Sequence, residues 1–506
     1  MKRLMALLLA LTLLAGCTQS GGGTGQDQDA ETVRDSMVSA FSADVGTFDP
    51  YVMSQTQELE LARNLFDSLT WLVIGESEPT MRIAQDCTVS EDGLEYLFTL
   101  RDDVYFHNGD KLTMDDVLYS IECFRTAPAT MSFSAVIDSV EAVEDDQVLI
   151  RLLTPSGSFF ESLNWLAIVP KALHESPDSD FANNPVGSGA YRLSDRTPGS
   201  EIVLEAFDQY YLGQPQIRTV TYKIIPDQST VAIALETGEL DYSKSVSFTS
   251  LADFEASDAL NVEVRTGNSV MFVFLNTKQA PYDDPLVRRA INLAIDREMC
   301  NTVQYEGYGE VATTMLSPTT FGHNESLAGF DYQPEEAAEL LAQAGYPDGG
   351  GFPPVVIETI DGFGRIAEVV QANLLSIGIQ AEIDLQEQNA YTTRALQGGV
   401  NFGIMGVGLG GDASSWGVMF QTGGAFNFAQ YENATLDALF DEAAVLSDSA
   451  ARKELYDEAF QLIEDEAVWV PLLYTTIAHV SNRQLDLSRG LEVGDNNLQP
   501  FYVTTP

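Results

Sequence analysis

The residues that could carry out chemistry are few and scattered along the 506-residue chain. Its four histidines, His107, His174, His323 and His479, stand singly, and a lone histidine is more often structural than catalytic or metal-binding. The sequence contains no G-x-x-x-x-G-K-[ST], G-x-S-x-G or H-E-x-x-H, so the common signatures of nucleotide hydrolysis, serine hydrolysis and zinc proteolysis are missing. The sequence therefore gives little support to an enzyme, and we expect no catalytic residue and no metal site.

One glycine-rich segment matches the consensus of a dinucleotide-binding motif. Gly406, Gly408 and Gly411 fit G-x-G-x-x-G, which cradles a pyrophosphate only where a helix follows at once and an acidic residue lies about 20 positions further on. The residues that follow, 412–424 (DASSWGVMFQTGG), are a poor helix start. We therefore expect no bound nucleotide and no other cofactor.

The context of Cys17 predicts export and lipidation. Lys2 and Arg3 precede an apolar run from Leu4 to Leu14, which is typical of a secretory signal and too short to span a membrane. The run leads through LLAG to Cys17 and resembles the lipobox of bacterial lipoproteins, in which this cysteine is acylated. We expect a signal peptide over 1–16 and, over 17–35, a lipidated cysteine with a flexible tether. The protein would then lie outside the cell membrane or in the periplasm, held by lipid alone.

The other cysteines and the charge exclude further classes. Cys87, Cys123 and Cys300 form no C-x-x-C and have no histidine nearby, so zinc is not expected, although one disulfide remains open. The formal net charge of −49, without a basic stripe, argues against binding to nucleic acid or anionic lipid. We interpret the acidity as a soluble surface adapted to its medium, with a preference for cationic ligands as the alternative.

Helical and strand patterns alternate throughout, which predicts an α/β fold. Thr113 with Asp116 forms a capping box, and Asp284 with Pro285 opens a second helix. A third helix begins at Pro334 and ends at Gly345. Further helices are expected over 365–377, 434–446 and 450–463, strands over 95–100, 379–385 and 468–474, and an extended segment over 103–109.

Four segments carry a family resemblance: Arg101–Arg125, Pro185–Leu193, Phe272–Glu298 and Glu335–Pro347. They resemble signature segments of the extracellular solute-binding proteins (family 5) of dipeptide, oligopeptide and nickel importers. The similarity runs from about Val38 to near the carboxyl end. It implies a periplasmic-binding-protein-like α/β fold with two hinged, ligand-gripping lobes and a smaller inserted subdomain.

The resemblance also implies domain boundaries. The chain would cross between the gripping lobes near Gly267–Phe274 and near Trp469–Thr476, where a few backbone angles can absorb a hinge rotation. The expected parts are lobe I (36–71, 188–266 and 473–506), the inserted subdomain (72–187) and lobe II (267–472).

Within the family, the loop that corresponds to Asn401–Trp416 faces the ligand. Peptide-binding members carry an aspartate there that pairs with the ligand's free amino group, and Asp412 matches it best. Gly408, Leu409 and Trp416 are expected to contact the ligand beside it. Peptide-binding relatives often have a tryptophan before the aspartate, whereas this chain has Leu409 there and Trp416 after it. Asp412 as a plain turn residue beside glycines stays open.

Two further groups are candidates for ligand contact. Arg365 resembles the position where some dipeptide-binding members hold the ligand carboxylate, with pairing to Asp361 as the alternative. Ser54, Gln55 and Thr56 follow a segment that borders the cleft in the family, and they could hydrogen-bond a peptide backbone.

These observations predict a monomeric substrate-binding lipoprotein of an ABC importer that captures di- or oligopeptides by hinge closure and delivers them to membrane permease subunits. One alternative keeps the scaffold and changes the ligand to a nickel chelate, an oligosaccharide or another small solute. A more remote alternative is an exported enzyme.

Overall fold

The computed structural model describes residues 34–73, 76, 78–446, 448–492 and 498–504. The predicted signal peptide, Cys17 and all but the last two residues of the predicted tether lie outside this range. Within it, no helix is both long enough and apolar enough to cross a membrane.

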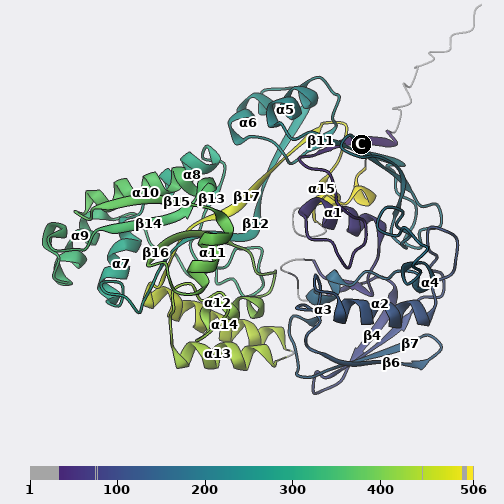
Figure 1. The fold of residues 1–506 in the computed structure, drawn as a ribbon, viewed down its shortest axis with the longest axis horizontal. Coiled ribbons are helices and arrows are strands. Elements are labelled where there is room, and N and C mark those ends of the chain that lie inside the picture. The colour runs from purple at the N-terminus through teal and green to yellow at the C-terminus, as the bar shows by residue number, and fades with distance from the viewer. Residues whose placement is uncertain (1–33, 74–75, 77, 447, 493–497, 505–506) are drawn as a thin grey trace, which may run out of the picture. The chain divides into compact units, whose positions relative to one another are not determined.

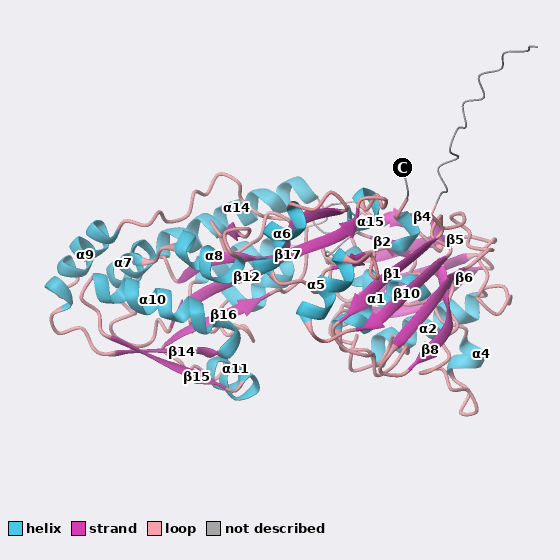
Figure 2. Cartoon of the chain, turned by 90° about the horizontal axis from the view of Figure 1, so that it is seen from above, coloured by secondary structure: helices cyan, strands magenta, loops and turns pink. Residues whose placement is uncertain are grey.

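The largest sheet has eleven strands, and its centre is a pair of long antiparallel strands, β12 (Leu260–Leu275) and β17 (Trp469–Asn482). The two strands lie side by side in Figure 1. On the β12 side follow β16 (Phe402–Val407), β14 (Val355–Ile360) and β15 (Ala381–Gln386). On the β17 side follow β11 (Tyr242–Ser243), β1 (Ser36–Phe41), β10 (Thr219–Ile224), β9 (Glu201–Ala206) and β8 (Tyr191–Thr197), while β13 (Glu310–Val311) pairs with β17 off this order. Figure 2 shows these strands in magenta.

The ladder between β12 and β17 has two register shifts, one between Met271 and Phe272 and a larger one between Thr266 and Val270. Thr266 pairs with Thr476 and Val270 with Tyr474, so β12 has two more residues than β17 in this interval. Extra residues of this kind bend a strand and leave backbone groups outside the ladder. The irregularity falls where the sequence predicted the two crossings between lobes.

β12 is buried on both faces beyond this irregularity. Val270, Phe272 and Phe274 pack into one apolar cluster, while Met271 and Val273 pack into another on the opposite face. Successive strand side chains point to opposite faces, so the continuous apolar run reflects cover on both sides. The first face is covered by helices and turns of the carboxyl-terminal part, namely α11 (Gln388–Leu396), α12 (Gly417–Phe420), α13 (Ala434–Ala444) and α14 (Ser449–Glu466). The second is covered by α7 (Pro285–Ala294), α8 (Arg297–Tyr305), α9 (Pro334–Gln343) and α10 (Gly364–Ser376).

The other end of the large sheet shares a core with a four-stranded sheet. This smaller sheet has the order β4 (Ala84–Val89), β5 (Glu95–Leu100), β7 (Gln147–Leu152), β6 (Ile137–Glu144), and α2 (Met114–Thr126) packs on it. The remaining elements near it are α1 (Thr56–Leu65), β2 (Thr70–Trp71), β3 (Thr80–Met81), α3 (Phe159–Ser162) and α4 (Lys171–His174). A further cluster joins α5 (Gln228–Glu236) and α6 (Leu251–Glu255) to β17, and α15 (Ser488–Glu492) lies near the carboxyl end.

The apolar clusters divide the chain at the two crossings. Two clusters draw their buried residues from between Val270 and Tyr474, and the other two draw theirs from outside that range. Residues 34–506 nevertheless pack as one unit. The lobe boundaries themselves stay a prediction, and the names lobe I, inserted subdomain and lobe II are kept below for the predicted ranges.

Most local predictions are confirmed. The Thr113 hydroxyl accepts from Asp116 N in a complete capping box, and Asp284 caps α7. α9 begins at Pro334, and Gly345 follows it with a φ of 98°. Two expectations differ. Residues 103–109 form a turn with one isolated bridge between Tyr105 and Lys111 instead of a strand, and β17 continues eight residues past 474 because lobe I strands extend the ladder.

The described cysteines are free thiols: Cys87 and Cys123 are half-buried and Cys300 is buried. No three acidic, histidine or cysteine side chains among the described residues cluster as metal ligands would. Histidines make structural contacts. His107 Nε2 lies 3.1 Å from the Gly189 carbonyl, and burial lowers its pKa to about 4.

Candidate ligand-binding cavity

A cavity of about 480 Å³ opens between residues of the predicted lobe I and inserted subdomain on one side and residues of the predicted lobe II on the other. Its volume falls within the range of about 300–1,000 Å³ typical of small-molecule sites. The residues that line it on one side are Arg63, Trp71, Leu72, Ser132, Phe133, Ser158, Glu161, Ser162, Asn164 and Trp165, and on the other side Asn268, Gly408, Leu409, Gly410, Ser415 and Phe426.

The walls combine aromatic rings with short polar side chains. Phe133 and Trp165 stack face to face, with ring centroids 4.4 Å apart. The Arg63 guanidinium lies 5.2 Å from the centre of the Trp71 ring. Serine hydroxyls, asparagine amides and the Glu161 carboxylate add polar groups to the wall. Such a lining suits a small solute that has both apolar and hydrogen-bonding groups.

Local structure fixes the positions of these side chains. Arg63 lies in the last turn of α1, whose first turn is secured by Glu58. Asn164 clamps the segment after β2, because its Oδ1 accepts from Leu72 N and its Nδ2 donates to the Leu72 carbonyl. The cavity wall on this side is therefore built on hydrogen-bonded elements, which favours a preformed site.

Glu161 is the acidic member of the lining. The amide of Gly411 donates to its Oε1 over 2.5 Å, which joins the inserted subdomain to the glycine-rich loop of lobe II. Its Oε2 is shielded from water and has no hydrogen-bond partner. Burial raises the pKa of Glu161 to about 7, against the opposing effect of the Gly411 amide. The repulsion from Asp412 adds to the rise, and the attraction of Arg452 reduces it.

A buried ion pair lies behind this wall. The Nη2 atom of Arg452, on α14, lies 2.5 Å from Oδ1 of Asp412, and both side chains are buried. Arg452 also donates to the carbonyl of Gly157 in the inserted subdomain and faces the Phe321 ring at 4.9 Å. Burial tends to lower the arginine pKa, but attraction to Asp412 and Tyr456 and hydrogen bonding to both together outweigh burial and leave the pKa raised. Asp412 Oδ1 also accepts from Ser414 N, which fixes the turn η5 (Ala413–Trp416).

The loop predicted to face the ligand does so in part. Gly408 and Leu409 line the cavity. Trp416 does not: it is fully buried, stacks on Phe420, and donates from Nε1 to the Gly410 carbonyl. Asp412 does not line this cavity either: it is only 6 % exposed and is paired with Arg452, so its predicted contact with a ligand amino group stays a prediction. The turn-residue alternative for Asp412 agrees with its bond to Ser414 N.

The other predicted contacts lie away from the cavity. Ser54 N and Gln55 N donate to the Glu58 carboxylate at the start of α1, and Thr56 is the first residue of that helix. Arg365 is 62 % exposed, and its closest carboxylate contact is Glu306 at 3.9 Å instead of Asp361. None of these four residues lines the cavity described above. Their roles in ligand binding stay predictions.

Sequence reasoning missed three residues of this region: Arg63, Glu161 and Arg452. The predicted helix over 450–463 contains Arg452, which lies on α14, but the helical pattern does not indicate which side chain Arg452 pairs with. Glu161 lies in a four-residue helix that has no periodicity to detect. Nothing in the sequence indicates that these residues approach the glycine-rich loop.

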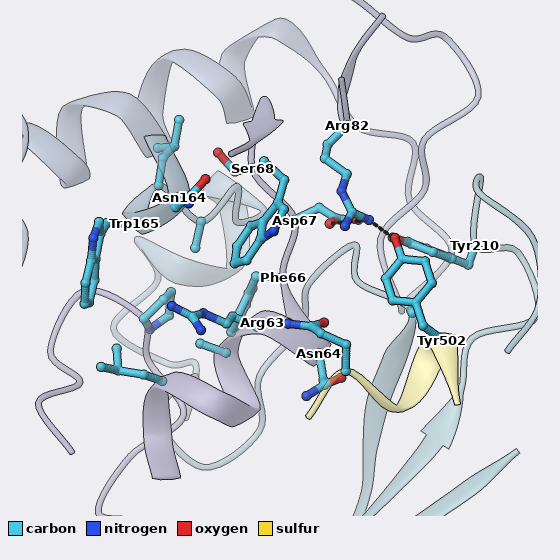
Figure 3. Close-up of a pocket in the computed structure, with 18 residues that line it drawn as sticks. Arg63, Asn64, Phe66, Asp67, Ser68, Arg82, Asn164, Trp165, Tyr210 and Tyr502 are labelled. Carbon is cyan, nitrogen blue, oxygen red and sulfur yellow. Dashed lines mark hydrogen bonds and ion pairs between the residues drawn. The ribbon is translucent and has the colours of Figure 1, made fainter. Parts of the chain in front are cut away.

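A smaller cavity of about 60 Å³ adjoins the first and shares Arg63, Trp71, Asn164 and Trp165 with it. In Figure 3 Arg63, Asn164 and Trp165 lie on one side, and Arg82 with Tyr210 and Tyr502 on the other. Arg82 Nη1 donates to the Tyr210 hydroxyl over 3.2 Å. The space is large enough for a few water molecules and extends the larger cavity toward lobe I.

Comparison with known proteins tests the predicted family and fold. Residues 78–428 match the family model described as "Bacterial extracellular solute-binding proteins, family 5 Middle". Heme-binding protein A of Haemophilus influenzae is 26% identical, with 94% of each chain covered. Glutathione-binding protein GsiB of Escherichia coli O1:K1 is 25% identical, with 95% of this chain and 94% of the relative covered.

A solved structure gives the same result. The ABC transporter-associated periplasmic binding protein DppA from Helicobacter pylori, in complex with the peptide STSA, superimposes with a TM-score of 0.74 at 27% identity. The alignment covers 94% of this chain and 98% of that structure. The predicted α/β fold and the family resemblance are therefore both confirmed.

Proposed function

The chain belongs to family 5 of the bacterial extracellular solute-binding proteins, and we propose that it captures a peptide or peptide-like solute for an ABC importer by closing its two lobes around the cavity of about 480 Å³. Proteins of this family are binding components of importers and not enzymes, so a permease is the expected partner.

The observation that carries the proposal is the origin of the cavity walls. Trp71, Phe133 and Trp165 precede the first crossing, whereas Leu409 and Phe426 follow it. A ligand held between them contacts both sides only when they are close, so its binding free energy favours the closed arrangement. The interrupted ladder between Thr266 and Val270 supplies a place where the backbone can rotate.

The known relatives support a peptide or a compound derived from one. One related structure holds a peptide, and one relative is named for glutathione. Another is named for heme, so the scaffold accommodates different ligands. A nickel chelate or an oligosaccharide stays as the alternative, since ligand choice depends on the site and not on the fold.

A thermal-shift panel tests the proposal. We expect one or more free dipeptides, tripeptides or glutathione to raise the melting temperature, because a ligand that binds only the folded state at a hundredfold excess over Kd adds about 2.7 kcal/mol. Nickel–histidine, heme and oligosaccharides serve as the alternatives. Stabilisation by one of these alone would replace peptide with that ligand class. Chemical conversion of any ligand would favour the exported enzyme.

Anchoring through Cys17 is proposed from the sequence alone. Replacing Cys17 with serine should leave a folded, ligand-competent protein that partitions into the aqueous phase, because the predicted tether separates the anchor from the packed core. A Cys17→Ser protein that still sediments with membranes would contradict lipid attachment at this residue.

A further inference from the structure

Glu161 is the one carboxylate among the described residues that line the larger cavity. Its two oxygens differ. Oε1 accepts from the Gly411 amide over 2.5 Å, whereas Oε2 is buried without any partner. Burial of an ionisable group that lacks part of its hydrogen bonding is unfavourable, and a cationic donor at Oε2 would remove this penalty.

We propose that Glu161 receives a primary ammonium group of the captured solute, so that the cavity selects small amines, above all zwitterions such as peptides with a free amino terminus. The inference rests on the proposed function of solute capture and names the group that the solute must carry. It assigns to the inserted subdomain a contact that the family resemblance placed in lobe II.

Asp412 is less suited to this task in the structure. Its Oδ1 is engaged by Arg452 and by Ser414 N, and the residue is absent from the cavity lining. An ammonium at Asp412 would compete with a buried guanidinium for the same carboxylate, which is electrostatically unfavourable. Asp412 instead holds the turn that follows Gly411, and this turn places the Gly411 amide against Glu161.

The opposite charge of a zwitterion also has a counterpart in the wall. Arg63 lines the same cavity from the end of α1, with its guanidinium over the Trp71 ring. A planar guanidinium matches a carboxylate in a two-point contact. A solute with an ammonium at one end and a carboxylate at the other would therefore meet the complementary side chain at each.

Rotation about the β12 irregularity would give the solute access to Oε2. Glu161 precedes the first crossing and Gly411 follows it, so opening of the lobes separates the two residues. An incoming amine can then reach the exposed carboxylate. On closure the Gly411 amide again donates to Oε1 while the amine occupies Oε2.

Calorimetric titration with alanyl-phenylalanine and N-acetyl-alanyl-phenylalanine tests the proposal. We expect the wild-type protein to bind the free amine about thirtyfold or more tightly than the acetylated peptide, because acetylation leaves the carboxylate unpaired. Glu161→Gln should lower the affinity for the free peptide by a similar factor and should change the affinity for the acetylated peptide little. The reason is that the substitution and the acetylation remove the same interaction. Glu91→Gln, which deletes an exposed acid of the same subdomain, should bind as wild type.

The pH dependence gives a second measure. Burial in the closed arrangement raises the pKa of Glu161 to about 7, so pairing with an ammonium on closure requires loss of the Glu161 proton. Affinity of the wild type for the free amine should fall by about tenfold for each pH unit below 7, while the peptide amino group stays charged. Glu161→Gln should lack this slope. Melting temperatures check that the variant is folded.

The outcomes separate the inference from the proposed function. If wild-type protein binds free and acetylated peptide equally, or if Glu161→Gln binds the free amine as tightly as wild type, peptide capture stands and the assignment to Glu161 is overturned. If neither peptide binds at millimolar concentration while nickel–histidine, heme or an oligosaccharide does, the peptide function and the assignment both fall. The wild-type comparison needs no variant, so misfolding of Glu161→Gln cannot obscure it.

Discussion

The guanidinium of Arg452 and the carboxylate of Asp412 lie 2.5 Å apart in a buried ion pair that holds the glycine-rich loop against α14. The same arginine donates to the Gly157 carbonyl in the inserted subdomain. One side chain thus connects the turn after Gly411 to the opposite wall of the cavity. The pair with Asp412 lies within the predicted lobe II and therefore holds the loop against α14 whether or not the lobes are closed.

Asp412→Asn should lower the stability of the ligand-free protein. The substitution leaves Arg452 buried without its counter-charge, and breaking such a pair costs about 3–5 kcal/mol. Urea unfolding measures the loss. Glu382→Gln, which removes an exposed acid of β15, should change stability little, and adding Arg452→Met to Asp412→Asn should restore part of the loss. An unchanged unfolding free energy in Asp412→Asn would show that the pair does not hold the loop.

Two arginines, Arg63 and Arg365, are candidates to bind a ligand carboxylate, and a substitution at each one distinguishes between them. Arg63→Gln should weaken binding of alanyl-phenylalanine by about tenfold or more, because Arg63 lines the cavity. Arg365→Gln should stay within about twofold, since Arg365 is 62 % exposed and contacts Glu306. Calorimetry on both variants with the free peptide and its carboxamide measures the contribution of the carboxylate. The reverse order of effects would favour the family-based assignment to Arg365.

His174 should make stability depend on pH above neutrality. Burial tends to lower its pKa, but hydrogen bonding and attraction to Asp49 and Cys123 together outweigh burial and raise the pKa to about 9. A raised histidine pKa adds stability that is fully present below the unfolded value of 6.5 and is lost as pH rises through about 9.

We therefore expect the wild type to lose on the order of 2–3 kcal/mol relative to His174→Gln between pH 6 and pH 10. Unfolding free energies measured in urea across this range provide the comparison. Because the other titrating groups are common to both proteins, their difference isolates His174. Parallel curves for the two proteins would contradict a charged His174 at neutral pH.

Ligand should draw the lobes together. We expect the radius of gyration from small-angle scattering to fall when the saturating ligand found in the thermal-shift panel is added, because both predicted crossings between lobes lie in the paired strands β12 and β17. Ser317→Ala removes the hydroxyl that donates to the Gly267 carbonyl at the irregular point of β12 and should make the ligand-free protein more variable in size. Identical scattering from the ligand-free and saturated protein would exclude hinge closure.

Local chemistry let the sequence predict much of the fold. Asp284 and Pro285 start α7, and Thr113 with Asp116 starts α2, because helix capping depends on neighbours within one turn. The family resemblance predicted the loop at the cavity, of which Gly408 and Leu409 do line the cavity, while the crossings between lobes stay a prediction. The sequence did not predict the continuation of β17 past residue 474, because a strand extends as far as neighbouring strands offer hydrogen bonds.

The sequence by itself thus determined the α/β elements and the family, whereas the tertiary structure decided which charges meet in the site. Glu161 contacts Gly411 across 250 positions of sequence, and Asp412 finds Arg452 across 40. Burial and partners set the chemistry of a carboxylate, and both depend on how distant segments pack. The same residue type is therefore a structural anchor at Asp412 and a half-satisfied acceptor at Glu161, a difference that no local pattern contains.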